Sequence, residues 1–269
     1  VNQLAKEFNI KPFNSAEKLI ESVSAVDFVS SNRVYFPELA RAIKSGKKIC
    51  IETTRKYTRQ ETEVLIKLSH EAQMPVQVNN CQRYSLTYKE IESHLQNPMI
   101  LVATRYIKYV QKDSGPELVG ELLATDIDIV LKSVKSNLRK VGATGLAVFD
   151  ETPDLINARL EFDNGSVANI TAGRISPEDS HILSFYQNNA YLEIDFTNQV
   201  SKINRKGTKK ICFGQPSMKN TDILSLKLQS FYDFIKHNQA PICTLEDEHT
   251  ALVVAEKISD KMKLTTKQI

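Results

Sequence analysis

Three polar residues stand at helical spacing in the middle of the chain. Glu121, Thr125 and Asp128 occupy positions i, i+4 and i+7, so a helix would place them on one face. The opposite side of that helix is apolar and should be buried, with Leu123, Ile127, Val130 and Val134. Two carboxyl groups on one face suit general acid–base chemistry, in which a buried carboxylate can act as the base. The alternative is that these polar residues and Lys132 form the solvent-exposed side of an amphipathic helix.

The first third of the chain alternates strands with helices. The apolar run from Val26 predicts a strand, a helical stripe ending at Gly46 follows, and residues 48–51 predict the next strand. Thr58 and Glu61 have the spacing of a capping box at the start of a further helix. A short strand after Pro75 completes the pattern. Strands separated by single helices imply a parallel sheet.

From about residue 81 the pattern changes. Alternating residues around an Asn164-Gly165 turn predict a hairpin, and strand-forming segments follow at 181–187, 190–196 and 199–213. One helix is predicted from about Glu117 to Val134, and two close the chain at about 221–238 and 247–263. We therefore expect two domains. Residues 1–80 form an α/β domain on a parallel sheet, and residues 81–269 form an α+β domain on a mainly antiparallel open sheet.

Bulk properties narrow the function classes. The 269 residues are 41% hydrophobic and 25% charged with a formal net charge of +3, which is ordinary for a globular protein and too weak a charge for nucleic-acid binding. No apolar run approaches the roughly 20 residues needed to cross a membrane, and no signal peptide is visible, so a cytoplasmic protein is expected. The histidines show no metal-ligand spacing, so no metal site is expected. Cys50, inside an apolar strand, should be a reduced, buried thiol.

Several segments, taken in order, resemble the Gfo/Idh/MocA oxidoreductases. They are the strand, helix and strand over Val26 to Glu52, the Leu118 to Leu131 helix, the region around Asp163-Asn164-Gly165, and the closing helix from Ala251 to Ile258. The resemblance implies a Rossmann-type dinucleotide-binding domain followed by a C-terminal domain for substrate binding and oligomerisation. It also implies a homo-oligomer formed through the C-terminal sheet.

The resemblance assigns cofactor-binding roles to positions that are changed here. Ser30 and Asn32 lie where family members carry Thr-Pro, and Tyr35 replaces a histidine; both places flank the nicotinamide in the family. Glu52 is the retained acid of a Glu-Lys-Pro motif, and Arg83 is the one match in a further motif. These five residues are the expected cofactor contacts. The alternative for the last two is a strand-end carboxylate and a surface cation.

The expected catalytic positions have also changed. Thr53 stands in place of the active-site lysine. On the substrate-facing helix, the Asp, His and Asp of the family become Glu121, Thr125 and Asp128. Oxidising an alcohol needs a base for the hydroxyl proton, and losing one such group costs about 10²- to 10⁴-fold in rate. Threonine supplies neither the basicity of histidine nor the charge of lysine.

No GxGxxG motif occurs in the chain. In a dinucleotide fold those glycines follow the first strand and let backbone N–H groups approach the pyrophosphate. The family would place about 40 residues of strand, helix and strand before Val1, since a βαβ unit takes roughly 30 or more. The missing strand would be central, so Val26 to Ser30 would present an unpaired apolar edge. We therefore expect this sequence to be a fragment.

Two functions remain open at this level. The preferred interpretation is a catalytically degenerate homologue that keeps a cleft for a sugar-like or nucleotide-sugar ligand, or serves as a structural or regulatory partner. The alternative is an active NAD- or NADP-dependent sugar or nucleotide-sugar oxidoreductase whose glycine-rich segment lies outside this sequence. No cofactor is expected for the 269 residues alone. Arg105 and Tyr106 lie on a predicted strand and are expected to be packing or interface residues.

Overall fold

The computed structural model of the chain describes residues 2–29, 36–54, 57–79, 82–108, 122–149, 152–207, 211–213 and 222–266. The chain forms two compact units. The first comprises Val1–Asn80 with Lys227–His249, and the second comprises Cys81–Leu226 with Thr250–Ile269. The predicted single boundary near residue 81 accounts for the first crossing between the units. The chain then returns to the first unit near its end, which the sequence did not suggest.

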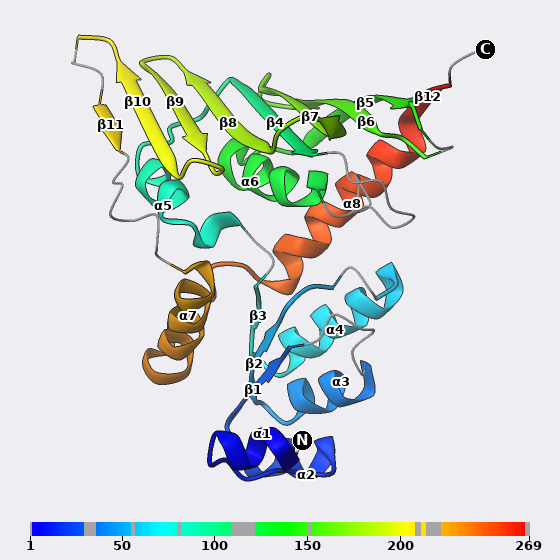
Figure 1. Cartoon of the computed structure of the whole chain (residues 1–269), viewed down its shortest axis with the longest axis vertical. Coiled ribbons are helices and arrows are strands. Elements are labelled where there is room, and N and C mark those ends of the chain that lie inside the picture. The colour runs from blue at the N-terminus through cyan, green and yellow to red at the C-terminus, as the bar shows by residue number, and fades with distance from the viewer. Residues whose placement is uncertain are drawn as a thin grey trace. The chain divides into compact units, whose positions relative to one another are not determined.

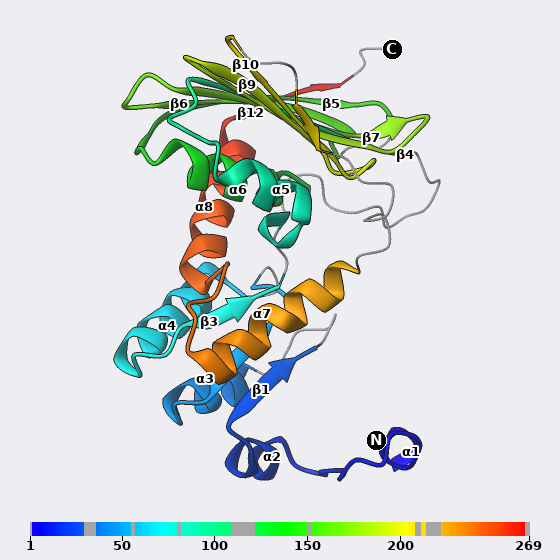
Figure 2. The same ribbon diagram turned by 90° about the vertical axis from the view of Figure 1, so that its left-hand side faces the viewer.

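The first unit is built on a parallel three-stranded sheet in the order β1-β2-β3. Its strands are β1 (Ala25–Phe28), β2 (Lys48–Ile51) and β3 (Val76–Val78). Helices α3 (Phe36–Lys44) and α4 (Arg59–Glu71) lie on one side of the sheet (Figures 1 and 2), after the short helices α1 (Asn2–Glu7) and α2 (Ala16–Ser22). β1 ends the strand order, and Val29 beyond it is 73% exposed. The predicted apolar edge therefore lies at the end of the described sheet.

Local sequence explains the helices of this unit. In α3, Leu39, Ala42 and Ile43 form the buried stripe, and Gly46 after it has φ +64°, a left-handed conformation that glycine adopts without strain. The predicted capping box is present at α4. The Thr58 N–H donates to Glu61 Oε2 at 2.7 Å, and the Glu61 N–H donates to Thr58 Oγ1 at 3.1 Å.

The other side of the three-stranded sheet is covered by a helix that comes much later in the sequence. Helix α7 (Ile223–His237) contributes Phe231 and Phe234, which pack against Cys50. The ammonium of Lys48 donates to the Phe234 carbonyl at 2.6 Å, close to the C-terminal end of that helix. Cys50 is a free, buried thiol, as predicted. Burial, followed by the carboxylates of Asp27 and Glu52, raises its pKa and keeps the thiol protonated.

The second unit is built on a nine-stranded sheet in the order β11-β10-β9-β8-β4-β7-β6-β5-β12. Two neighbouring pairs, β4 with β7 and β5 with β12, are parallel, and the others are antiparallel. The strands are β4 (Ile100–Lys108), β5 (Leu138–Ala147), β6 (Leu155–Phe162), β7 (Val167–Ser176), β8 (Ser180–Gln187), β9 (Ala190–Asp195), β10 (Val200–Arg205), β11 (Ile211–Phe213) and β12 (Met262–Thr266). The predicted fold class, a parallel sheet domain plus a mainly antiparallel α+β domain, is confirmed.

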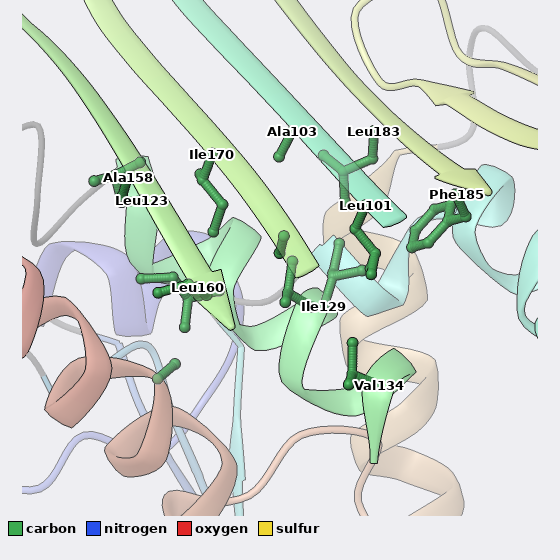
Figure 3. Close-up of a cluster of buried hydrophobic side chains, with 14 of the residues drawn as sticks. Leu101, Ala103, Leu123, Ile129, Val134, Ala158, Leu160, Ile170, Leu183 and Phe185 are labelled. Carbon is green, nitrogen blue, oxygen red and sulfur yellow. The ribbon is translucent and has the colours of Figure 1, made fainter. Parts of the chain in front are cut away.

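Helices cover one face of this sheet and enclose its core. They are α5 (Leu86–Glu92), α6 (Ala124–Val134) and the later turns of α8 (Leu245–Lys261). Figure 3 shows side chains of β4, β6, β7 and β8 meeting those of α6, among them Leu101, Ile170, Leu183 and Ile129. Within the part of the chain that the structure describes, no helix has the length and apolar character needed to cross a membrane.

A buried carboxylate fastens the β5–β6 connection to the end of β7. Asp154 accepts hydrogen bonds from the N–H groups of Val148 and Phe149 at 2.7 and 2.9 Å, and from Nε of Arg174 at 2.7 Å. Burial raises the pKa of the Asp154 carboxyl, but the two backbone N–H groups and the Arg174 guanidinium outweigh burial and lower it below its ordinary value. Arg174 therefore has a structural role near the end of β7.

The capping box of α4 gives the first prediction. We expect Thr58→Ala to lower the free energy of unfolding by about 1 kcal/mol, because the Glu61 N–H loses its acceptor. Thr58→Ser keeps the hydroxyl and should retain most of that stability. Urea unfolding of the three proteins measures the difference, and equal stability of the alanine and serine variants would contradict the assignment.

Asp154 gives a pH-dependent prediction. Because its folded pKa is lowered, the carboxylate stabilises the fold above the ordinary aspartate pKa of about 3.9, and this stabilisation is lost as pH falls through the folded pKa. Asp154→Asn should therefore be less stable than the native protein at pH 7, and the gap should narrow below pH 4. Asp163→Asn, at an exposed hairpin position, is the matched control. A gap independent of pH would refute the ionic role.

Candidate functional site

The N-terminal half of α6 carries buried polar residues. Thr125, Asp126 and Asp128 are all buried, while Lys132 further along the helix is exposed. The interpretation of Thr125 and Asp128 as part of a solvent-exposed helix face is therefore wrong. Buried polar groups require hydrogen-bond partners, and the partners of these residues define the site. Glu121, the first member of the predicted set, lies outside the described residues.

Asp128 is paired with Arg83. Arg83 belongs to the short 3-10 helix η1 (Gln82–Tyr84), and its Nε and Nη2 donate to the two carboxylate oxygens of Asp128 at 2.8 and 2.9 Å. The side chains are only 1% and 9% exposed. Arg83 is therefore not a surface cation, and that alternative is wrong. This two-point contact joins one predicted cofactor residue to one predicted catalytic residue and holds α6 against η1.

Two neighbouring strands supply the partners of Thr125 and Asp126. Arg105 of β4 and His181 of β8 are directly opposite in the antiparallel register, so their side chains share one face of the sheet. Nη1 of Arg105 donates to Thr125 Oγ1 at 2.7 Å and to the Leu122 carbonyl at 3.3 Å. Nε2 of His181 lies 2.6 Å from Asp126 Oδ1.

A cavity of about 310 Å³ opens beside this pair of strands. Arg105 and His181 both line it, and the ring of Phe196 stacks on the His181 ring with centroids 4.5 Å apart. Most other lining residues carry hydroxyl, amide or carboxylate groups, including Gln82, Ser85, Thr87, Glu90, Asp179, Ser180, Thr197 and Gln199. Arg105 was expected to be only a packing or interface residue; instead it is a wall of this cavity. Leu86, Ile107, Ile223 and Leu226 complete the wall, so the cavity presents apolar surface together with hydrogen-bonding groups, a combination that suits a sugar-like ligand.

The first unit holds the remaining described site residues, at the carboxyl ends of its strands. Glu52 follows β2 and accepts from Nδ2 of Asn79, which follows β3, at 3.2 Å. Thr53 and Thr54 both donate through Oγ1 to the carboxylate of Glu248, each at 2.7 Å, and the Thr54 N–H donates to it at 2.6 Å. The position expected for a lysine thus holds a neutral hydroxyl bound to a buried carboxylate. The predicted cofactor contacts Ser30, Asn32 and Tyr35 lie outside the described residues.

Three residues of this arrangement were not predicted. His181 and Asp126 could have been found from pattern, because His181 is the polar end of a buried row that continues with Leu183 and Phe185. Asp126 adjoins the predicted Thr125. Glu248 gave no local signal, since it lies nearly 200 residues from its threonine partners in the sequence.

The comparisons with known proteins agree on fold. No family model matches the chain. A curated UDP-N-acetylglucosamine 3-dehydrogenase from Acidithiobacillus ferrooxidans is 22% identical over 249 residues, which is 90% of this chain and 79% of that protein. A solved structure of that enzyme, GnnA, superposes with a TM-score of 0.86 at 21% identity and covers 97% of this chain and 86% of its own.

More distant solved structures share the same arrangement. The KijD10 3-ketoreductase from Actinomadura kijaniata, in complex with NADP and TDP-benzene, has a TM-score of 0.74 at 15% identity over 99% of this chain and 87% of its own. A dehydrogenase (MviM) from Clostridium difficile has a TM-score of 0.80 at 18% identity over 96% and 86%. The resemblance is therefore confirmed at the level of fold: this chain has the two-domain fold of the Gfo/Idh/MocA-type dehydrogenases.

Proposed function

We propose that the protein containing this chain is an NAD- or NADP-dependent oxidoreductase that acts on a nucleotide sugar. The observation that carries the proposal is the match to a UDP-N-acetylglucosamine 3-dehydrogenase along 97% of this chain. The cavity lined by Arg105 and His181 supports it, because its hydroxyl, amide and charged groups can hydrogen-bond to the hydroxyls of a sugar, and its apolar wall can contact the sugar ring. This is the alternative of the two functions weighed from the sequence, and the likeness favours it over the degenerate homologue.

The first unit has the sheet edge at which a dinucleotide binds in such folds. Ligands of open parallel sheets bind outside the carboxyl ends of the strands, and Glu52 and Asn79 stand there, joined by a hydrogen bond. When bound, a nicotinamide dinucleotide would accept or supply the hydride. Glu52 is the residue of this chain that would contact the dinucleotide. The glycine-rich turn that binds pyrophosphate is not among these 269 residues.

A second candidate function is a homologue that binds a nucleotide sugar without turning it over. The observation in its favour is that the reactive lysine and histidine positions hold threonines whose hydroxyls are engaged. Thr53 donates to Glu248, and Thr125 accepts from Arg105. Hydroxyl groups held in this way supply hydrogen bonds and no charge.

The proposal extends to self-association through the second sheet. The helices cover one face of that sheet (Figure 1), and strands β6 and β7 carry polar side chains that bond to one another across the strands, such as Asn157 to Thr171 and Arg159 to Asn169. A second copy could pair with such a face. Light scattering of the native protein tests this part, and a monomer at micromolar concentration would contradict it.

The two candidate functions separate in one assay. The native protein is incubated with UDP-N-acetylglucosamine and NAD⁺ or NADP⁺, and absorbance at the reduced-nicotinamide band is followed together with the melting temperature. An oxidoreductase should produce reduced cofactor. A binding protein should gain stability with the nucleotide sugar and produce none. If neither ligand changes absorbance or melting, the nucleotide-sugar assignment is wrong.

The Arg83–Asp128 pair gives a prediction about stability. Asp128→Asn removes the charge that compensates a buried guanidinium, so the free energy of unfolding should fall by about 3–5 kcal/mol. Replacing both residues together, as Arg83→Met with Asp128→Leu, should recover part of that loss. Arg139→Met, which removes an exposed arginine, is the matched control and should change stability by less than about 1 kcal/mol. An Asp128→Asn protein of native stability without turnover would instead assign Asp128 to the chemistry.

A further inference from the structure

The core-facing side chains of β4 and β8 change from apolar to polar toward one end of the two strands. Along β8, Phe185 and Leu183 are buried in the apolar core, and the next residue on that face is His181. Along β4, Leu101 and Ala103 are followed in the same way by Arg105. An apolar side chain would continue the core at either place, so the polar pair needs an explanation beyond packing.

His181 forms a dyad with Asp126. The imidazole Nε2 lies 2.6 Å from Oδ1 of a carboxylate that is completely buried. An ionised carboxylate can only accept, so the proton of a neutral ring lies on Nε2 and Nδ1 carries the free lone pair. Nδ1 has no hydrogen-bond partner among the described residues, and His181 lines the cavity. The ring therefore has the arrangement of a general base held by a carboxylate.

Asp126 and Arg105 both carry polar atoms that have no hydrogen-bond partner among the described residues. Oδ2 of Asp126 is buried and has no hydrogen-bond partner in the described part of the chain, a condition that is uncommon for a buried polar atom. Among the described residues, Arg105 donates to protein acceptors through Nη1, and its other N–H groups have no acceptor in that part of the chain. A base and a fixed cation thus lie opposite each other in the strand register.

We propose that His181, oriented by Asp126, is the acid–base group for the sugar hydroxyl that is oxidised, and that Arg105 stabilises the oxygen as its proton leaves. The inference rests on the proposed function. In the oxidation direction the hydroxyl O–H bond breaks and its proton moves to Nδ1 of His181. The carbinol C–H bond breaks with its electron pair, which passes as hydride to the nicotinamide, and a C=O bond forms.

This assignment accounts for Thr125. A histidine at that position would supply an imidazole from α6; here β8 supplies one beside the same helical turn, and Thr125 instead orders Arg105 through a 2.7 Å hydrogen bond. Asp126 is a positioning residue, because it acts through His181. The chain thereby keeps one base and one cation at the cavity with residues that no catalytic spacing in the sequence indicated.

The test compares variants of the native protein with UDP-N-acetylglucosamine and the nicotinamide cofactor it uses. His181→Asn should lower kcat by about 10²- to 10⁴-fold and change KM by less than about 3-fold, since only acid–base help is removed. Asp126→Asn should lower kcat less, with KM again unchanged, and Asp126→Glu should recover part of the loss. His70→Asn, at an exposed histidine of the first unit, is the matched control and should behave as the native protein.

The outcomes separate the two proposals. Native kcat in the His181→Asn protein overturns the inference and leaves the oxidoreductase standing. A native protein that produces no reduced cofactor overturns the proposed function and the acid–base role together. If the His181 variants do not fold, the ring resonances of His181 are followed in the native protein by NMR during addition of UDP-N-acetylglucosamine. A shift confined to His181 supports the assignment, and an unchanged His181 resonance refutes it.

Discussion

The burial of charge in the N-terminal half of α6 is the constraint on which the second unit depends. A charge removed from water must be paired or hydrogen-bonded, because the alternative costs several kcal/mol. Asp128 is met by Arg83, and Asp126 by His181. Each contact joins α6 to a different element, so ionic contacts hold the polar residues of this helix, while its apolar residues such as Ile129 belong to the core shown in Figure 3.

Much of the fold followed from local pattern. The capping box at Thr58, the hairpin at Asn164-Gly165 and the buried thiol of Cys50 are each determined by neighbours in sequence, and each is present. The return of the chain to the first unit was not foreseen. Phe231 and Phe234 give α7 an apolar stripe. Such a stripe predicts that the helix is buried, but it does not predict which sheet the helix packs against. Such choices are made by long-range packing.

In the candidate site, too, single residues were predicted from the sequence, while the contacts between them were not. Arg83 and Asp128 were both selected from the resemblance, but their contact with each other could not be, because it depends on how η1 docks against α6. His181 belongs to no catalytic motif, and the sequence pattern marks it only as the polar residue at the end of the buried row of β8. His181 becomes a candidate site residue because Arg105 lies directly opposite it on the neighbouring strand. That strand register is fixed only when the whole sheet assembles.

The two threonine substitutions have unequal consequences. The resemblance places a histidine at position 125, and in our proposal His181 supplies that imidazole at the same part of α6 while Arg105 supplies a charge. At Thr53, where the resemblance places a lysine, a neutral hydroxyl donates to the buried carboxylate of Glu248. Proton transfer at the cavity can therefore be retained while the electrostatic help of a lysine is not supplied by that position. Under the proposed oxidoreductase function, we therefore expect slow turnover in which His181 of the second unit handles the proton.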